Sequence, residues 1–156
     1  RDKGMLNHIF AACLMVAAQN YAIPPQVLVG ILYVEGGKVG QQVRNSNGTY
    51  DLGPMQINTL WTKVLADEWG VSRSYAHRMI RDDACTNINV AAWIFRKNWN
   101  ETKSLPKAIE WYNSRTPHIG RKYRYKVIAA MKNKKLLAPP KQDPNVQNFA
   151  YMQKAE

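Results

Sequence analysis

The sequence predicts a mainly helical fold, all-α or at most α+β, with about six to seven helices and one polar loop or small hairpin. Apolar residues recur at spacings of three and four along most of the chain, which is the pattern of amphipathic helices. Proline or glycine marks the boundaries between these segments. Residues 36–57 instead carry Asn, Ser and Gly, and they are predicted to form the loop or hairpin.

A chain of 156 residues suits one domain with a single hydrophobic core, which we expect over 1–137. The remaining segment, 138–156, contains three prolines and little periodicity, and it is predicted to be a tail or a strap over the domain. No run approaches the roughly 20 apolar residues that span a bilayer, so the sequence predicts a soluble chain without a membrane span.

The first two helices are predicted at about 4–20 and 25–36, joined as a hairpin. Pro24 prevents one continuous helix, while Pro25 suits the first turn of the second. The apolar run near the N-terminus is interrupted by Asn7 and continues into helical periodicity. We therefore interpret it as part of the domain, and expect that a signal peptide has been removed ahead of it.

A third helix is predicted after the polar stretch, where Asn58 or Thr59 can cap its start and Gly70 closes it. Ser72 can then open a short helix that continues to about residue 80. The buried side of this short helix is predicted to comprise Tyr75, Met79 and Ile80.

The strongest helical periodicity of the second half lies in 83–99, which predicts the central core helix. Its apolar positions are Ile88, Ala91, Ala92, Phe95 and Trp99. Another helix is predicted at 105–113 with Pro106 in its first turn. Residues 114–120 are predicted as a loop and 121–137 as the last helix.

The chain is strongly basic, with 22 Lys and Arg against 11 Asp and Glu, and a net charge of +11. This balance predicts attraction to a polyanion such as nucleic acid, an anionic membrane surface or cell wall. The last predicted helix has no acidic residue, and a solvated face and a binding face are equally good interpretations of it. Its basic residues are Arg121, Lys122, Arg124, Lys126, Lys132, Lys134 and Lys135.

Cys13 and Cys85 are the two cysteines of the chain. They suit either one disulfide in an exported protein or two buried free thiols in a cytosolic one. If they are bonded, the bridge would tie the first helix to the start of the central helix. It would close a loop of about 70 residues and stabilise the fold by roughly 3 to 4 kcal/mol.

Glu35 is the first candidate catalytic residue. With Leu28, Ile31 and Leu32 it completes an i, i+3, i+4, i+7 pattern, so a helix here points a carboxylate along its own apolar stripe. Partial burial should raise the pKa of this carboxyl and keep it protonated as a proton donor. The alternative is a boundary residue whose stem packs while its head reaches water.

The stretch EGGKVGQQVRNSNGTYDLGPMQIN combines a helix ending on an acid, a polar loop and a D-x-G-x-M-Q-I-N motif. This order resembles the lysozyme-like lytic transglycosylases, in particular the small members associated with secretion and conjugation systems. The resemblance covers about 5–135 and includes the cysteine and the proline of the helical hairpin. It implies a single lysozyme-like domain with the hairpin at its cleft.

The resemblance assigns roles residue by residue. Glu35 matches the single catalytic acid of the family. The positions expected to line the cleft and bind substrate are Gly53, Met55, Gln56 and Asn58 of the motif, Tyr112 and Asn113 of an A-x-x-Y-N motif that starts at Ala108, and Tyr123 four residues before Val127. Gly36 stands where many members have Ser, Ser114 where they have Gly, and Pro54 where an aliphatic residue is commoner.

The implied reaction cleaves the β-1,4 bond between N-acetylmuramic acid and N-acetylglucosamine. Glu35 would protonate the leaving oxygen and then take the proton of the C6 hydroxyl, which leaves a 1,6-anhydro product. Asp51 offers an alternative, because its motif also resembles the animal-type lysozymes, in which an Asp at this place is the second carboxylate of a retaining hydrolase. Transglycosylase is favoured over hydrolase on the overall pattern.

The resemblance further implies a monomer without cofactor, periplasmic or secreted, acting on peptidoglycan strands and associated with a secretion, conjugation or pilus system. Two other classes compete with it. A basic nucleic-acid-binding module has only the charge in its favour, and no nucleic-acid-binding motif occurs. A non-catalytic glycan-binding adaptor would not require a buried acid. A metal site is not expected, because His8, His77 and His118 are scattered.

Overall fold

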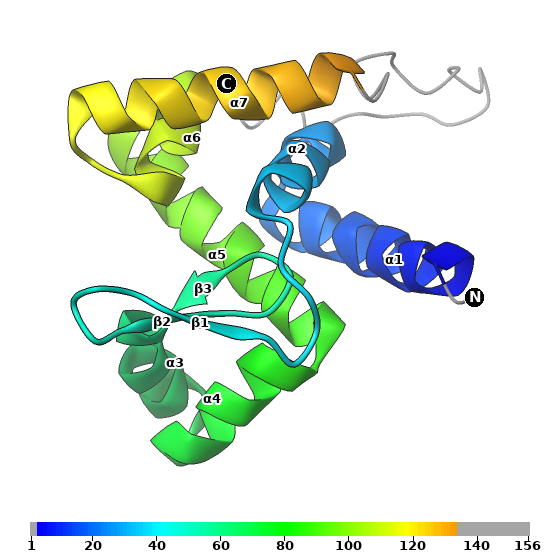
Figure 1. The fold of residues 1–156 in the computed structure, drawn as a ribbon, viewed down its shortest axis with the longest axis vertical. Helices are drawn as coiled ribbons and strands as arrows, with labels where there is room; N and C mark the ends of the chain where they lie inside the picture. The colour runs from blue at the N-terminus through cyan, green and yellow to red at the C-terminus, as the bar shows by residue number, and fades with distance from the viewer. Residues whose placement is uncertain (1–2, 134–156) are drawn as a thin grey trace. The chain divides into compact units, whose positions relative to one another are not determined.

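The structure is a computed structural model that describes residues 3–133, so the predicted tail at 138–156 lies outside the described residues. The described part is mostly helical with one small sheet, as predicted (Figure 1). The elements are α1 Lys3–Tyr21, α2 Pro25–Glu35, β1 Gln42–Arg44, β2 Tyr50–Leu52, β3 Ile57–Asn58, the 3₁₀ helix η1 Thr59–Trp61, α3 Thr62–Trp69, α4 Arg73–Asp82, α5 Ala84–Thr102, α6 Leu105–Asn113 and α7 Pro117–Asn133. None of the helices within residues 3–133 is both long and apolar enough to cross a membrane.

Contacts group the chain into two units. The sheet unit takes in the segment up to Leu14 together with Glu35–Ala91, and so contains the strands, α3 and α4. The helical unit takes in Met15–Val34 and the chain from Ala92 onward, and so contains α6 and α7. Helices α1, α2 and α5 each contribute residues to both units.

The sheet of the sheet unit is antiparallel in the order β1-β2-β3. Its register places Asp51 opposite Val43 on one side and opposite Asn58 on the other. The β1–β2 turn is closed by two backbone hydrogen bonds, from Asn45 N to Thr49 O at 2.8 Å and from Gly48 N to Asn45 O at 3.0 Å. The polar stretch that lacks helical periodicity is therefore a small hairpin followed by a third short strand.

A disulfide between Cys13 and Cys85 joins α1 to the start of α5, with a Cα–Cα distance of 4.9 Å. Of the two states predicted for the cysteines, a disulfide or two free thiols, the disulfide is thus confirmed. The buried apolar side chains of this unit come from the sheet and from the helices around it, and they include Leu14, Leu52, Met55, Ile57, Leu65, Ala66, Ala76, Ile80, Ile88, Val90 and Ala91.

Helix α4 begins as predicted, and its buried side agrees with the prediction at Ile80 but not at Tyr75. The Ser72 side chain accepts a hydrogen bond from Tyr75 N at 3.0 Å and caps the helix. Tyr75 itself is 44% exposed, whereas Ala76 and Ile80 are fully buried. The prediction that Tyr75 is buried was wrong because the inward stripe of the helix runs through positions 76 and 80, one turn apart.

In the helical unit, α6 starts where the sequence predicts, with Ser104 accepting from Lys107 N at 3.3 Å and Pro106 in the first turn. Helix α7 starts at Pro117, four residues earlier than predicted, so the loop before it is short. Thr116 O accepts from the backbone N of Gly120 at 2.9 Å, which forms the first turn around Pro117. All five apolar positions predicted for the core of α5, which runs through both units, are buried: Ile88, Ala91, Ala92, Phe95 and Trp99.

Helices α2 and α7 meet closely within the helical unit at Gly30. A Cβ on Gly30 would lie 2.6 Å from Met131 Cγ and 3.1 Å from Val127 Cγ1. Val127 is fully buried and Met131 nearly so. The absence of a side chain at position 30 therefore lets α7 pack directly on the backbone of the helix that ends in Glu35.

Candidate active site

Glu35 is the last residue of α2 and is half-buried. The helix ends there because Gly36 adopts φ 60, a left-handed conformation that stops helical hydrogen bonding. The prediction that the helix ends directly after the acid is confirmed. Val27, Leu28 and Ile31 of the same helix are buried, so the carboxyl group stands at the end of an apolar stripe and keeps some exposure to solvent.

Gly37 connects the end of α2 to the motif turn, by which we mean residues 53–56. Gly37 N donates a hydrogen bond to Pro54 O at 3.2 Å. A Cβ on Gly37 would press on Gly53 O and would lie 2.7 Å from Gln56 Nε2. The backbone two residues after Glu35 therefore touches the motif turn directly, and only glycine allows this approach.

The motif turn itself is held in an uncommon conformation. Gly53 and Gln56 have φ values of 65 and 53, both in the left-handed region. Gln56 donates twice to Gly53 O, from its backbone N at 3.1 Å and from Nε2 at 2.9 Å. A non-glycine residue in this region costs roughly 1 kcal/mol or more, and such residues cluster where a binding site requires them.

The hairpin residues next to this turn bond to one another. Asp51 Oδ1 accepts from Asn45 Nδ2 and from Asn58 Nδ2, each at 3.1 Å. Asn58 Nδ2 also donates to Thr49 Oγ1, and Asn58 Oδ1 accepts from Leu60 N at 2.9 Å and caps η1. Asp51 and Asn58 thus share one face of the sheet, and both fasten the strands.

Met55 and Asn113 occupy contrasting environments. Met55 is 0% exposed, so its side chain belongs to the core that supports the motif turn. Asn113 is exposed and is the last residue of α6 in the helical unit. Whether either residue contacts a substrate stays a prediction from the family resemblance.

The two tyrosines expected at a substrate site lie together in the helical unit. The rings of Tyr112 and Tyr123 are stacked, with centroids 6.3 Å apart and planes at 19°. Near them in the sequence, Glu110 is 3% exposed and pairs with Arg124 at 2.8 Å and with Lys107 at 3.6 Å. The partly buried pair of Glu110 and Arg124 joins α6 to α7 one or two residues away from each tyrosine.

A family model for the transglycosylase SLT domain matches residues 12–135. The chain belongs to this family. The matched range contains Glu35, the motif turn and both tyrosines, and membership of the family indicates lytic transglycosylase activity on peptidoglycan. A search of curated proteins finds no match to the chain.

Gly36 differs from the Ser that many lytic transglycosylases similar to this chain have at this position. The backbone conformation at Gly36 accounts for the glycine. The φ of 60 at Gly36 is a conformation in which a side chain with a Cβ costs roughly 1 to 2 kcal/mol. Glycine therefore ends α2 of this SLT domain without strain at the residue next to the acid.

Asn87 is a residue of the site region that the sequence analysis missed. It is fully buried in α5, and its Oδ1 accepts from Met55 N at 2.8 Å. Its Nδ2 donates to Leu52 O at 2.8 Å and to Ile80 O at 2.9 Å. One amide thus holds β2, the motif turn and α4 of the SLT domain. The sequence signal for this role was a polar residue four positions before Ala91 in an otherwise apolar stripe of the helix.

No group of three or more metal-ligating side chains that could hold an ion occurs within residues 3–133. Cys13 and Cys85 are bonded to each other.

Proposed function

We propose that the chain cleaves the β-1,4 bond between N-acetylmuramic acid and N-acetylglucosamine and leaves a 1,6-anhydro end, with Glu35 as acid and then base. The observation that carries the proposal is the placement of Glu35. It ends α2, and the backbone two residues later contacts the motif turn that carries Gln56. A substrate held at this turn is therefore near the end of the acid's helix.

One carboxyl group is sufficient for both proton transfers. Protonated Glu35 gives its proton to the leaving oxygen, and the resulting carboxylate is then a base. The C6 hydroxyl of the muramic acid residue loses its proton to Glu35 as its oxygen attacks C1. Glu35 is thereby protonated again, and the new bond between the C6 oxygen and C1 closes the 1,6-anhydro ring.

Asp51 is the second carboxylate of the competing hydrolase hypothesis. Its Oδ1 already accepts hydrogen bonds from two amides of the hairpin. Hydrogen bonds to one carboxylate oxygen fasten the hairpin and also keep a carboxylate ionised, so they are compatible with either role for Asp51. The proposal assigns the chemistry to Glu35 alone on the overall family pattern.

The Cys13–Cys85 disulfide supports action outside the cytosol, since disulfides persist in oxidising compartments. We propose that the protein works in the periplasm or after secretion, where peptidoglycan is accessible. Association with a secretion, conjugation or pilus system is proposed on the resemblance to small specialised transglycosylases.

Mass spectrometry of the products released from purified sacculi tests the assignment. Glu35→Gln should keep the melting temperature and lower the cleavage rate by about a hundredfold or more, because general acid–base catalysis typically contributes 10²–10⁴-fold. Glu68→Gln is the matched control, since Glu68 is exposed on α3. Unchanged cleavage by Glu35→Gln would remove Glu35 from the proposal.

Asp51→Asn separates the two reaction types in the same assay. The Asn oxygen can still accept from Asn45 and Asn58, so the hairpin should persist. A transglycosylase retains its anhydro product in this variant. Loss of cleavage with an intact fold, together with reducing ends in the wild-type products, would instead establish the hydrolase.

A further inference from the structure

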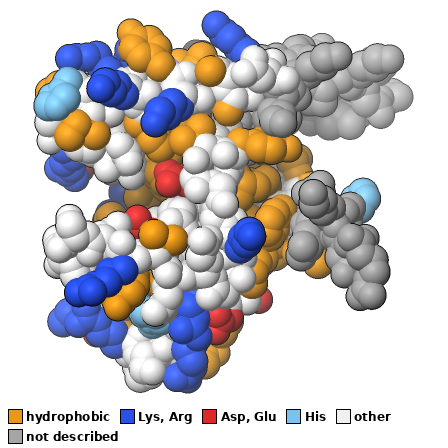
Figure 2. Space-filling view, in the orientation of Figure 1, with side chains coloured by type: hydrophobic (Ala, Val, Ile, Leu, Met, Phe, Trp, Pro, Cys, Tyr) orange, Lys and Arg blue, Asp and Glu red, His pale blue; other side chains and the backbone are white. Residues whose placement is uncertain are grey.

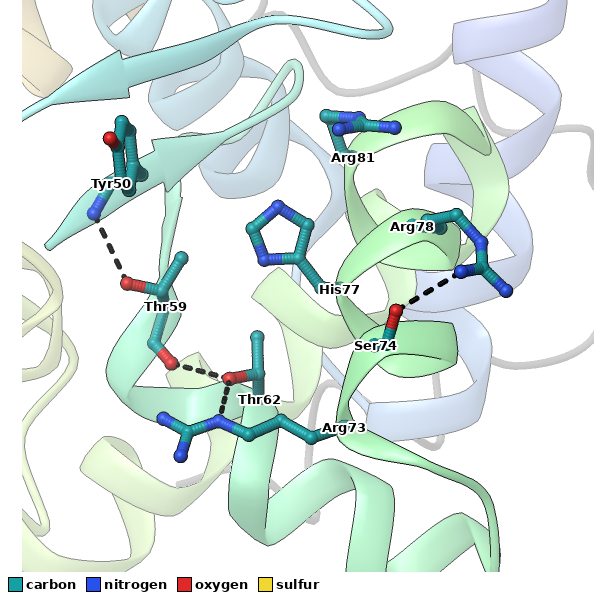
Figure 3. Close-up of a pocket in the computed structure, with 8 residues that line it drawn as sticks. All are labelled: Tyr50, Thr59, Thr62, Arg73, Ser74, His77, Arg78 and Arg81. Carbon is teal, nitrogen blue, oxygen red and sulfur yellow. Dashed lines mark hydrogen bonds between the residues drawn. The ribbon is translucent and has the colours of Figure 1, made fainter.

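A cavity of about 550 Å³ lies within the sheet unit, and its lining includes neither Glu35 nor Asp51. Strand β2, η1 and α3 form one wall, and α4 forms the other (Figure 3). Its lining residues are Tyr50, Thr59, Thr62, Arg73, Ser74, His77, Arg78 and Arg81. We call this cavity the arginine pocket. Three arginines, a histidine and four hydroxyl groups line it.

The spacing of the α4 residues explains why positive charge gathers here. Arg73, His77 and Arg81 are separated by four residues each, so they share one face of the helix. Figure 3 shows the His77 ring between the strand side and α4, with Arg73 and Arg81 at opposite ends of this row. Figure 2 shows basic side chains gathered over the part of the surface where α4 lies in Figure 1.

The positive charge of the pocket is only partly neutralised. Arg81 pairs with Asp82, with Nε 2.7 Å from Oδ1, and its Nη1 lies 3.4 Å from Gln42 Oε1. Arg73 donates from Nε to Thr62 Oγ1 at 3.2 Å, and Arg78 donates to Ser74 Oγ at 3.1 Å. Within residues 3–133, neither of these last two arginines forms a salt bridge.

Such a site suits an anion with several oxygen atoms. Guanidinium groups bind carboxylate and phosphate through paired N–H donors, and the hydroxyl groups of the pocket can add further hydrogen bonds. The cavity is much larger than a single carboxylate or phosphate group needs. Its occupant should therefore be a short polar segment that carries an anionic group.

The pocket and the candidate glycan-binding residues share one hairpin. Tyr50 precedes Asp51 in β2, and Thr59 follows Asn58. Because successive strand residues face opposite sides, the Tyr50 side chain lies on the other face of the sheet from Asp51. A segment attached to a glycan at the Asp51 face needs only to pass the edge of a short hairpin to reach the pocket.

We propose that the arginine pocket binds the carboxylate groups of the peptide stems of peptidoglycan. This rests on the proposed function, which makes a peptidoglycan strand the substrate. The sugars linked to stems carry no free carboxylate, so the stems supply the negative charge of the polymer. An extended stem of four residues spans roughly 13 Å, more than twice the roughly 5 Å spacing of neighbouring strands in a sheet.

The pocket gives this SLT domain a means of preferring strands that still carry their stems. Glycan contacts at the motif turn would be shared by stemmed and bare strands. Contacts at Arg73 and Arg78 would be made by stemmed strands alone. These contacts are remote from the scissile bond. We therefore expect them to change the affinity for a strand and not the cleavage step itself.

The test measures binding in the Glu35→Gln background, so that no substrate is consumed. Arg73→Gln/Arg78→Gln is compared with its parent on intact sacculi and on glycan strands whose stems an amidase has removed. Loss of two charge-assisted contacts should weaken binding to sacculi by about tenfold or more. The difference between variant and parent should disappear on the bare strands.

Two further variants keep the outcome interpretable. Lys122→Gln/Lys132→Gln removes the same charge from exposed positions of α7, and it should bind sacculi like the parent. Arg73→Lys/Arg78→Lys keeps the charge and should recover part of the affinity if folding is intact. Equal weakening by the α7 control, or equal weakening on bare strands, would overturn the proposal in favour of general charge attraction.

A synthetic stem peptide with free carboxylates should bind the parent and compete with sacculi, while its fully amidated form should not. Retained competition by the amidated form contradicts the proposal. Anionic phospholipid vesicles and duplex DNA serve as phosphate-bearing probes, and pocket-dependent binding to these probes but not to the stem peptide would assign the site to phosphate. If the active wild type cleaves neither stemmed nor bare strands, the proposed function fails. If it cleaves both and stems make no difference to binding, only the pocket proposal fails.

Discussion

Gln56 has a strained backbone conformation in the motif turn, and two of its own hydrogen bonds hold it there. Its φ of 53 is unfavourable for a side chain with a Cβ, yet its Nε2 donates to Gly53 O and its backbone N donates to the same oxygen. Gly37 approaches this turn so closely that a methyl group would meet Gly53 O. The strained conformation is therefore maintained by contacts from the segment directly after Glu35.

His77 is a residue whose ionisation near neutral pH is affected by the fold. Partial burial lowers the pKa of His77 from its ordinary value of 6.5, and the nearby Arg81 lowers it further, while Asp82 acts in the opposite direction. Arg73 and Tyr50 also line the cavity around the ring. Protonated His77 is thus less favourable in the folded protein than in the unfolded chain.

This shift predicts a pH dependence of stability with a definite sign. The unfolded chain binds a proton at position 77 more readily, so stability falls as the pH falls below 6.5 and levels off below the folded pKa. Urea unfolding at about pH 7.5 and about pH 5.5 measures the difference. His77→Gln should lose less stability on acidification than wild type.

His118→Gln is the matched control, because His118 is exposed in the first turn of α7. It should lose as much stability as wild type between the two pH values. An equal loss in wild type and His77→Gln would show that His77 does not contribute.

At the scale of elements, Asn87 is the contact on which the arrangement around the motif turn depends. Its amide satisfies one backbone N–H and two backbone carbonyls from three different segments. A buried backbone group left without a partner costs about 1 to 3 kcal/mol. The hairpin, α4 and α5 of the sheet unit are therefore coupled through a single side chain.

Asn87→Ala should destabilise the protein by about 3 kcal/mol or more, because three buried backbone groups lose their partner. Asn87→Asp keeps the acceptor for Met55 N but cannot donate to Leu52 O or Ile80 O, so it should be destabilising as well. Chemical denaturation measures both variants. Asn100 is on the exposed side of the same helix and accepts two hydrogen bonds from the Arg96 guanidinium at 2.9 Å, so Asn100→Ala should cost about 1 kcal/mol or less. Similar values for positions 87 and 100 would contradict the coupling.

For the molecule as a whole, the disulfide is the strongest single constraint on the chain. It joins residues 72 positions apart, and its closed loop contains α2, the sheet, α3 and α4. The net charge of +11 fits a protein that works on an anionic polymer, and the family indicates that this polymer is peptidoglycan. The disulfide and the charge agree with a protein that works on the cell wall.

Cys13→Ala/Cys85→Ala should lower the free energy of unfolding by about 4 kcal/mol, because the unfolded chain regains the freedom that a 72-residue loop closure removes. Thermal and urea unfolding of this variant should match those of reduced wild type. Unchanged stability in both would show that the bridge adds nothing to the fold.

Local signals in the sequence were sufficient for much of this description. The periodicity of α5, the cap at Ser72, the glycine after α3 and the proline in α6 act within a few residues, so they could be interpreted without any knowledge of distant segments. The end of α2 at Glu35 was predictable for the same reason. The family motifs added the candidate roles of Glu35 and Gln56.

Other features depended on which distant segments meet. The amide of Asn87 is important because Leu52, Met55 and Ile80 present backbone groups to it, and nothing local to position 87 specifies them. The arginine pocket exists because β2, η1 and α3 come to face the basic side of α4. The sequence by itself determined the presence of the helices, the capped start of α4, the end of α2 and the acid at position 35, since these follow from short-range sterics and hydrogen bonding. Only the tertiary structure decided the hydrogen bonds of Asn87, the arginine pocket and the burial of Met55, because these follow from long-range packing.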